Sequence, residues 1–175
     1  MTSAPNPALD RNPDLDPANN PAVAAVAASG VRHEVREHGR ASSLAEAARM
    51  RGVTPRQIVK SMVVKDGTGE YHVVLVPGDR VISWPKLRGV LGVNKAAMPS
   101  AEEAKAVTGF ARGTITPFGT ATPLDVVADA LVEPGPITVG GGAHSVAIYL
   151  DGDDLLAHFG ATRVDITDPD PAFAE

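Results

Sequence analysis

The amino-acid sequence predicts a single α/β or α+β domain built on a mixed β-sheet. Its 175 residues are enough for one domain with a substantial core and too few for two. Short β-branched runs and capped, amphipathic segments intermix from one end of the chain to the other. Hydrophobic residues make up 43% of the chain but aromatic residues only 4%, so we expect a core of Val, Leu, Ile and Ala.

The domain is expected to span residues 22–170, after a flexible tail at residues 1–21. The tail carries five prolines and almost no large apolar side chains, too little to offset the entropy of ordering it. It lacks the basic opening and apolar run of a secretory signal. The chain has no cysteine and no apolar stretch near the ~20 residues of a membrane span. We therefore expect a cytoplasmic protein without disulfides or thiolate metal sites.

In the first half of the chain, caps and turn residues delimit each element. In order, they predict a helix at 22–29, a strand at 31–37, a helix from Ser42 or Ser43 to Arg51, and strands at 58–65 and 71–76. The second helix has the clearest signal, because Glu46 can complete a capping box and Gly52 can end the helix. The loop at 66–69, Asp-Gly-Thr-Gly, is typical of a hairpin between the two strands that flank it.

The second half follows the same rules. In order, they predict a helix at about 83–91, a short strand at 93–97, a helix at 100–108, strands at 126–128, 137–139 and 146–150, a helix at 153–159, and a strand at 163–166. Pro85 suits the first turn of its helix. Ser100, followed by Glu102 and Glu103, marks the start of the next helix.

Charge is distributed unevenly along a chain whose formal net charge is −5. Residues 31–65 carry a local charge of +5, whereas residues 113–175 carry −9. The net charge argues against a general nucleic-acid binder, but a positive face could attract phosphate. Ordinary solvated surfaces explain the asymmetry equally well. It permits an RNA partner without requiring one.

Lys60 is a cation in the otherwise apolar strand predicted at 58–65. A charge in such a position is costly unless it serves a ligand or reaches solvent. Alternation alone can place Lys60 at an exposed edge, and from the strand by itself this is the preferred interpretation.

Glycines gather in two loops. Residues 108–119, Thr-Gly-Phe-Ala-Arg-Gly-Thr-Ile-Thr-Pro-Phe-Gly, lie between a helix and a strand. Backbone N–H groups in such a loop can hold a carbonyl oxygen or an oxyanion, although a plain turn is the alternative. Residues 140–145, Gly-Gly-Gly-Ala-His-Ser, match neither a dinucleotide fingerprint nor a P-loop.

Together these segments resemble the YbaK family, which includes free-standing aminoacyl-tRNA deacylases and the editing domain inserted in bacterial prolyl-tRNA synthetases. The resemblance runs from about Val31 to Thr167. It rests on the helix before the Lys60 strand, the glycine-x-x-x-proline loop at Gly113–Pro117, Asp129 after a short strand, and the glycine turn before Asp154-Leu155. It implies a single YbaK-like domain whose mixed, mostly antiparallel β-sheet or partial barrel is flanked by helices.

The resemblance also implies the site. Lys60 and Gly113 match the family's active-site lysine and glycine, so they are the expected catalytic residues. The expected substrate-binding residues are Thr114, Thr116, Pro117, Asp129, Gly141, Gly142 and His144. An aminoacyl ester is already reactive, so positioning, a held water and a stabilised oxyanion suffice without a nucleophilic triad.

Some positions depart from the family's pattern. Thr114 stands where some relatives have a second glycine, Asp125 where proline is common, and Ala143-His144 where many have basic residues. These changes leave the choice of substrate open. His144 could contact the amino acid, although a lone loop histidine is more often solvated. The other histidines lie on separate elements without acidic partners at ligand spacing, so neither a metal nor a cofactor is expected.

The implied function is hydrolysis of the ester of alanine, cysteine, serine or threonine on wrongly charged tRNA, with tRNA for proline as the expected acceptor. The expected partner is aminoacyl-tRNA, with a prolyl-tRNA synthetase as an open second partner and no membrane. Two alternatives stay open: a non-catalytic module that binds tRNA or a synthetase, and a hydrolase of another small ester. Salt-sensitive tRNA binding with turnover would favour the deacylase over both.

Overall fold

The structure, a computed structural model, describes residues 12–173. Five helices are present in this range, each of eight residues, and all five were predicted from the sequence. They are α1 (Pro21–Ala28), α2 (Leu44–Arg51), α3 (Trp84–Leu91), α4 (Ala101–Thr108) and α5 (Gly152–Phe159). Short 3-10 turns lie at Pro13–Leu15, Pro55–Gln57 and Pro171–Phe173.

Ten strands form two sheets and a ribbon. The strands are β1 (His33–Glu37), β2 (Val59–Asp66), β3 (Tyr71–Pro77), β4 (Arg80–Ile82), β5 (Ala96–Ala97), β6 (Asp125–Asp129), β7 (Pro136–Gly140), β8 (Val146–Asp151), β9 (Arg163–Val164) and β10 (Thr167–Pro169). The larger sheet has the order β5-β2-β3-β6-β9, the smaller sheet β1-β8-β7, and β10 pairs with β4. Pairing is antiparallel except for β3 with β6 and β6 with β9. The mixed sheet is confirmed, and the described strands do not close into a barrel.

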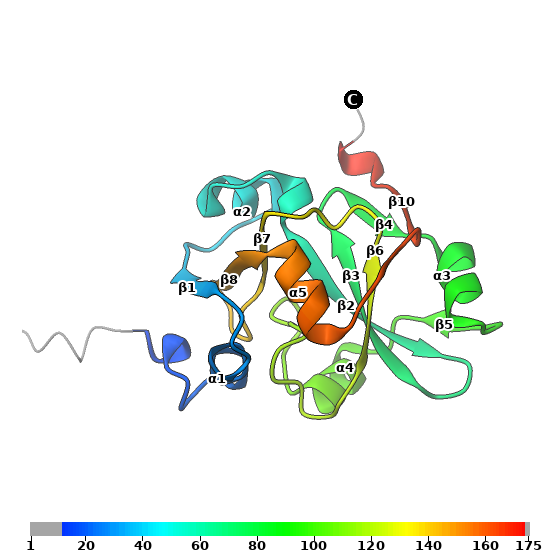
Figure 1. Cartoon of the computed structure of the whole chain (residues 1–175), viewed down its shortest axis with the longest axis horizontal. Helices are drawn as coiled ribbons and strands as arrows, with labels where there is room; N and C mark the ends of the chain where they lie inside the picture. The colour runs from blue at the N-terminus through cyan, green and yellow to red at the C-terminus, as the bar shows by residue number, and fades with distance from the viewer. Residues whose placement is uncertain (1–11, 174–175) are drawn as a thin grey trace, which may run out of the picture.

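The core lies between the two sheets. Its fully buried side chains include Val59 and Leu75 from the larger sheet, Ile137 and Ile148 from the smaller one, and Leu155 from α5. A second apolar cluster packs Leu87 of α3 against the other face of the larger sheet. Figure 1 shows α3 beside β4 and β5 at one end of the molecule and α1 beside β1 at the other. Aliphatic residues thus supply most of the core, as the composition predicts.

Local signals explain the start of α2. The Ser43 hydroxyl accepts a hydrogen bond from the Glu46 N–H at 3.1 Å, and the Glu46 carboxylate accepts one from the Ser42 N–H at 2.8 Å. These bonds satisfy N–H groups that have no partner within the helix. The capping box is therefore shared between Ser42 and Ser43, and α2 ends before Gly52 as expected.

The structure differs from the sequence prediction at two short strands. β4 and β10 have three residues each and were not predicted. The strand predicted at 163–166 is shorter, ending at Val164, and the chain then turns through the buried Ile166 into β10. Such short strands offer too few residues for alternation to be recognised.

Part of the predicted tail lies against the domain. Asn20 is 3% exposed, and its amide nitrogen donates to the carbonyl oxygens of Gly141 at 2.8 Å and Asp14 at 2.9 Å. Its side-chain oxygen accepts from the N–H of Ala22 and so caps α1. The segment at 12–20 is thus tied to the glycine loop, whereas residues 1–11 of the predicted tail lie outside the described range.

We expect Asn20→Ala to lower the free energy of unfolding by about 1–3 kcal/mol, because it removes a helix cap and leaves the buried Gly141 carbonyl without its donor. Asn19→Ala is the matched control, since Asn19 is exposed and should change stability by less than about 0.5 kcal/mol. Urea denaturation followed by circular dichroism measures both. Equal stability of the two variants would contradict the structural role of Asn20.

Candidate active site

An unpaired stretch of β2 defines the site. β3 pairs with β2 along Val59–Lys65, whereas β5 pairs with it only at Lys65 and Asp66. Before β2, a single parallel bridge joins Ile58 to Thr138 of β7. Within the described chain, the residues between these contacts therefore pair with β3 alone. Their second edge presents backbone N–H and C=O groups that a ligand can bind.

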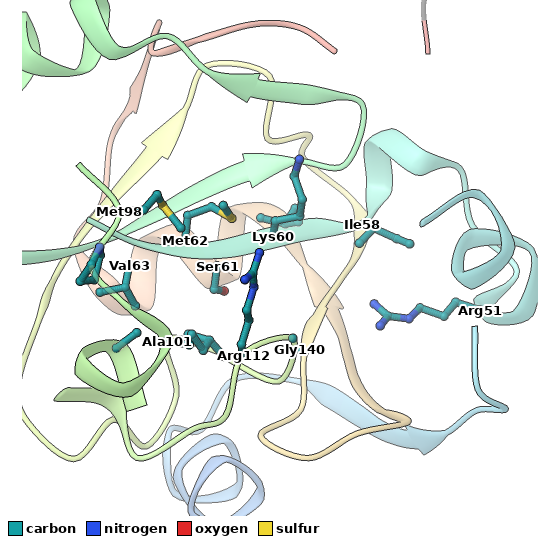
Figure 2. A pocket seen from close by; sticks show the side chains of 15 residues that line it. Arg51, Ile58, Lys60, Ser61, Met62, Val63, Met98, Ala101, Arg112 and Gly140 are labelled. Atoms are coloured by element: carbon teal, nitrogen blue, oxygen red, sulfur yellow. The ribbon is translucent and has the colours of Figure 1, made fainter. Parts of the chain in front are cut away.

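A cavity of about 460 Å³ lies along this edge, and we call it the edge cavity. Six consecutive residues, Ile58–Val63, line it, together with Met98 and Pro99 before α4 and Arg112 and Gly113 after it. Side chains alternate between the two faces of a strand, so a run of six places the cavity beside the strand edge rather than on one face. In Figure 2, Arg112 extends toward β2 from the loop after α4.

A second hollow of about 780 Å³, the loop cavity, adjoins the first. It is lined by His38, by residues 40–44 and Ala47 at the start of α2, and by residues 143–146 in the glycine loop before β8, including His144. The two cavities share four residues: Arg51, Ile58, Gly113 and Gly140. Gly113 and Arg51 therefore lie at their junction, and Figure 2 shows Arg51 reaching toward it from α2.

The lining of both cavities is positive. It contains four cations, Lys60, Arg112, Arg51 and Arg40, and none of the described Asp or Glu residues lines either cavity. The whole chain has a net charge of −5, so this concentration of positive charge is local. Such a concave surface attracts anions.

Lys60 is held by the backbone of β4. Its Nζ atom donates to the carbonyl oxygen of Arg80 at 2.7 Å. Burial lowers the pKa of the Lys60 ammonium, while the nearby carboxylates of Asp170 and Asp79 act in the opposite direction. An ammonium group has three N–H donors, so two remain for a ligand.

The position of this carbonyl depends on β10. The Arg80 guanidinium donates to the Thr167 hydroxyl at 3.0 Å and to the Thr167 carbonyl at 3.1 Å. The Asp170 N–H donates to the Asp79 carbonyl at 3.0 Å. The ribbon of β4 and β10 thus fixes both the hydrogen-bond acceptor of Lys60 and the acidic groups that favour its charged form.

Gly113 occupies a conformation that favours glycine, with φ of +86°. The N–H of the following residue, Thr114, is already bonded to the Ala111 carbonyl at 3.0 Å. Among residues 12–173, by contrast, the Gly113 N–H makes no hydrogen bond, and Gly113 is one of the four residues that line both cavities. It can therefore donate to a ligand oxygen at the junction.

The sequence profile of the aminoacyl-tRNA editing domain matches residues 38–157, more than half of the chain. The chain belongs to this family. The matched region contains both cavities, whereas β9 and β10 follow it. The resemblance to YbaK-type domains read from the sequence is thereby confirmed.

Relatives of this editing domain occur inside longer proteins. The proline–tRNA ligase of Trichlorobacter lovleyi is 34% identical over 91 residues, which cover 52% of this chain and 16% of the ligase. The proline–tRNA ligase of Fervidobacterium nodosum is 34% identical over 119 residues, which cover 64% of this chain and 20% of the ligase. The chain thus spans at most about a fifth of the length of these ligases.

Solved structures share the fold over most of the editing domain. A candidate trans-editing enzyme for prolyl-tRNA synthetase has a TM-score of 0.77 and 28% identity, over 83% of this chain and 93% of that one. A hypothetical protein with 23% identity has a TM-score of 0.75, over 82% of this chain and 96% of that one, and shows the fold alone.

The editing domain brings three of the predicted site residues to the cavities. Lys60 lines the edge cavity, His144 the loop cavity, and Gly113 both. Three others, Thr114, Thr116 and Pro117, are buried behind the Gly113 loop and line neither cavity. Thr114 instead joins the two glycine loops, because its carbonyl accepts from the Gly142 N–H at 3.0 Å.

The other predicted substrate-binding residues also lie outside the two linings. Gly141 is buried, and its N–H donates to the Val146 carbonyl at 3.0 Å. Asp129 is 1% exposed, and its carboxylate accepts from the N–H groups of Leu131 and Ile166. A direct contact of these residues with substrate stays a prediction. Their observed hydrogen bonds join segments of the chain to one another.

Sequence reasoning missed three residues of the site: Arg51, Ser61 and Arg112. Ser61 had a usable signal, since it interrupts the alternating inward face of β2 between Val59 and Val63, each 1% exposed. Its hydroxyl is buried, and no described protein group pairs with it. Arg112 stood directly before Gly113 in the loop that was singled out. Arg51 had no signal that distinguished it from the neighbouring Arg49.

No cluster of three His, Asp or Glu side chains with the spacing of a metal site occurs among residues 12–173. Across the same range, each helix is too short or too polar for a transmembrane span.

We expect the pKa of Lys60 to lie below the usual lysine value of about 10.4 and to fall further in Asp170→Asn, because that change removes a carboxylate that favours the charged amine. Asp168→Asn is the matched control, since Asp168 faces Lys86 at 3.3 Å. NMR titration of the lysine side chains measures the pKa in each protein. A Lys60 pKa that is unchanged or higher in Asp170→Asn would contradict this arrangement.

Proposed function

We propose that this editing domain hydrolyses the ester of a small wrong amino acid on tRNA, as a free-standing deacylase. The observation that carries the proposal is the junction of two positively lined cavities at Gly113, with Lys60 in one of them. Membership of the aminoacyl-tRNA editing family supports the reaction class. The prolyl-tRNA synthetase connection of its relatives supports tRNA for proline as acceptor and the cytoplasm as its place of action.

The two cavities suit the two parts of an aminoacyl ester, the terminal nucleoside and the amino acid. The edge cavity offers apolar surface at Met98 and Pro99 beside the cations Lys60 and Arg112, which suits a nucleoside with its phosphate. The loop cavity has small and polar walls, including Ala47, Ser43 and His144, which suit a small amino acid. The ester would then lie at Gly113, the residue that both cavities share.

Positioning and charge stabilisation account for the chemistry. Water adds to the ester carbonyl carbon, and the Gly113 N–H stabilises the negative charge that develops on the carbonyl oxygen. The neighbouring ribose hydroxyl relays a proton from the attacking water to the ester's ribose oxygen. That oxygen then leaves as a hydroxyl group when its bond to the carbonyl carbon breaks. Lys60 holds the terminal nucleotide through its free N–H donors. No protein nucleophile is needed, in keeping with a chain that has no cysteine.

The alternative of a non-catalytic binding module receives less support. Such a module would need the cations but not a free N–H at the junction. The unbonded Gly113 N–H, in a cavity that Lys60 and the open edge of β2 also line, favours a reaction centre over a simple binding surface.

We expect the native protein to release at least one of alanine, cysteine, serine and threonine from mischarged proline tRNA. Lys60→Met should lower that rate by about a hundredfold or more, because it removes the charge while keeping an unbranched side chain. Lys105→Met is the matched control, since Lys105 is exposed on α4 and should leave the rate unchanged.

Release of amino acid from purified mischarged tRNA measures the rate, and circular dichroism confirms that each variant folds. No release of any of the four amino acids by the native protein would overturn the proposed function. Full activity of a folded Lys60→Met would remove Lys60 from the mechanism.

The cavity assignment has its own test. Ala47→Leu narrows the loop cavity, so we expect release of threonine to fall at least about tenfold more than release of alanine. Ala45→Leu on the exposed side of α2 is the control and should change neither. Rates measured with both mischarged tRNAs give the ratio, and an unchanged ratio in Ala47→Leu would place the amino acid elsewhere.

A further inference from the structure

Arg51 is a cation at the junction that no described carboxylate neutralises. It comes from the last turn of α2 and lines both cavities. Its guanidinium contacts a hydroxyl and an imidazole: Nη1 donates to the Thr138 hydroxyl at 2.9 Å, and Nη2 lies 3.4 Å from Nε2 of His38. No ion pair involving Arg51 occurs within residues 12–173.

The partners of Arg51 position it without offsetting its charge. The second ring nitrogen of His38, Nδ1, lies 2.8 Å from the Gly39 carbonyl and can donate to it, so that Nε2 can accept from the arginine. Meanwhile the Arg51 Nε atom is buried without any partner. Burial lowers the pKa of the guanidinium, which reflects the cost of keeping this charge away from water.

The end of the helix does not account for this arrangement. Cations near a helix C-terminus gain a modest dipole interaction, but Arg49 in the same turn has that interaction while remaining exposed. Arg51 instead points toward Thr138 of β7 and into the shared wall of the cavities (Figure 2). A partly buried, positioned guanidinium without an ion-pair partner is a receptor for an anionic group.

We propose that Arg51 binds the phosphodiester of the substrate's terminal nucleotide. This inference rests on the proposed function, in which the ester lies at Gly113. The phosphate is attached to the same ribose as the ester, and Arg51 and Gly113 line the same two cavities. Arginine presents parallel N–H donors that match two oxygens of a phosphate group. Arg51 would thereby fix the ribose between the two cavities.

The test compares two dinucleotides on the full chain. One is cytidylyl-3′,5′-adenosine, with its single negatively charged phosphodiester. The other has the same two bases joined by a neutral methylphosphonate. Isothermal titration or NMR titration at fixed salt gives the affinity ratio of the charged to the neutral ligand for the native protein, Arg51→Gln and Arg49→Gln.

We expect the native protein to bind the charged dinucleotide about tenfold more tightly than the neutral one. This difference in affinity corresponds to one charge-assisted hydrogen bond. Arg51→Gln should lower this ratio at least about fivefold, and Arg49→Gln should keep it. A native ratio near one, or an undiminished ratio in Arg51→Gln, would overturn the proposal. A shift in amino-acid preference with an unchanged ratio would assign Arg51 to the amino-acid pocket and would also overturn it.

A structural role for Arg51 gives a different result. Removal of an unpaired, partly buried charge should leave the melting temperature unchanged or higher. If Arg51→Gln instead melts lower and weakens both dinucleotides equally, the residue supports the fold and the proposal fails. Arg51→Met, which keeps the length of the side chain, repeats the comparison should the glutamine variant not fold.

The dinucleotide titration and the deacylation assay can each overturn one proposal while leaving the other standing. A native protein that releases no amino acid but shows an Arg51-dependent preference for the charged dinucleotide would retain the phosphate site and lose the proposed function. A native protein that deacylates tRNA while Arg51→Gln keeps the ratio would retain the function and lose the phosphate site.

Discussion

Strand β2 is paired along its length on one edge only, and the site lies at the edge that is left open. β3 satisfies one edge of the strand, whereas β7 reaches the second edge only before Val59 and β5 only from Lys65 onward. Backbone polar groups between these contacts need water or a ligand, since leaving them unsatisfied is costly. Gly113 and Gly140 line the edge cavity together with this stretch of the strand. Gly140, the last residue of β7, lies so close to the Gly113 loop that a Cβ atom would lie 2.5 Å from the Ile115 carbonyl oxygen.

Much of the fold could be predicted because its elements carry local signals. Ser43 and Gly52 delimit α2 through hydrogen bonds within a few residues, and the Asp-Gly-Thr-Gly loop joins β2 to β3 as its composition indicates. The ribbon of β4 and β10 could not be predicted, because it joins Arg80–Ile82 to residues nearly ninety positions later. The position of Asn20 was equally unreadable, since its partner Gly141 is distant in sequence.

For the site, the sequence supplied two residues through the order and spacing of its motifs. Context alone favoured an exposed lysine and a plain turn, so Lys60 and Gly113 were identified through the family resemblance, and both line the edge cavity. Arg51 did not stand out, because an arginine at the end of a surface helix is ordinary and only the tertiary contact with Thr138 distinguishes it. Asp129, expected near the substrate from the same resemblance, has a buried carboxylate that accepts hydrogen bonds from the backbone N–H groups of Leu131 and Ile166.

Because Lys60 is positioned by a carbonyl of β4, the site can form only late in synthesis of the chain. Lys60 precedes its acceptor by twenty residues, but that acceptor is fixed by β10, and the smaller sheet joins β1 to β8 near the other end of the domain. On the ribosome, the lysine emerges more than a hundred residues before Thr167 can lock Arg80 in place. A chain released early would therefore carry the family's signature residues without the arrangement that positions them.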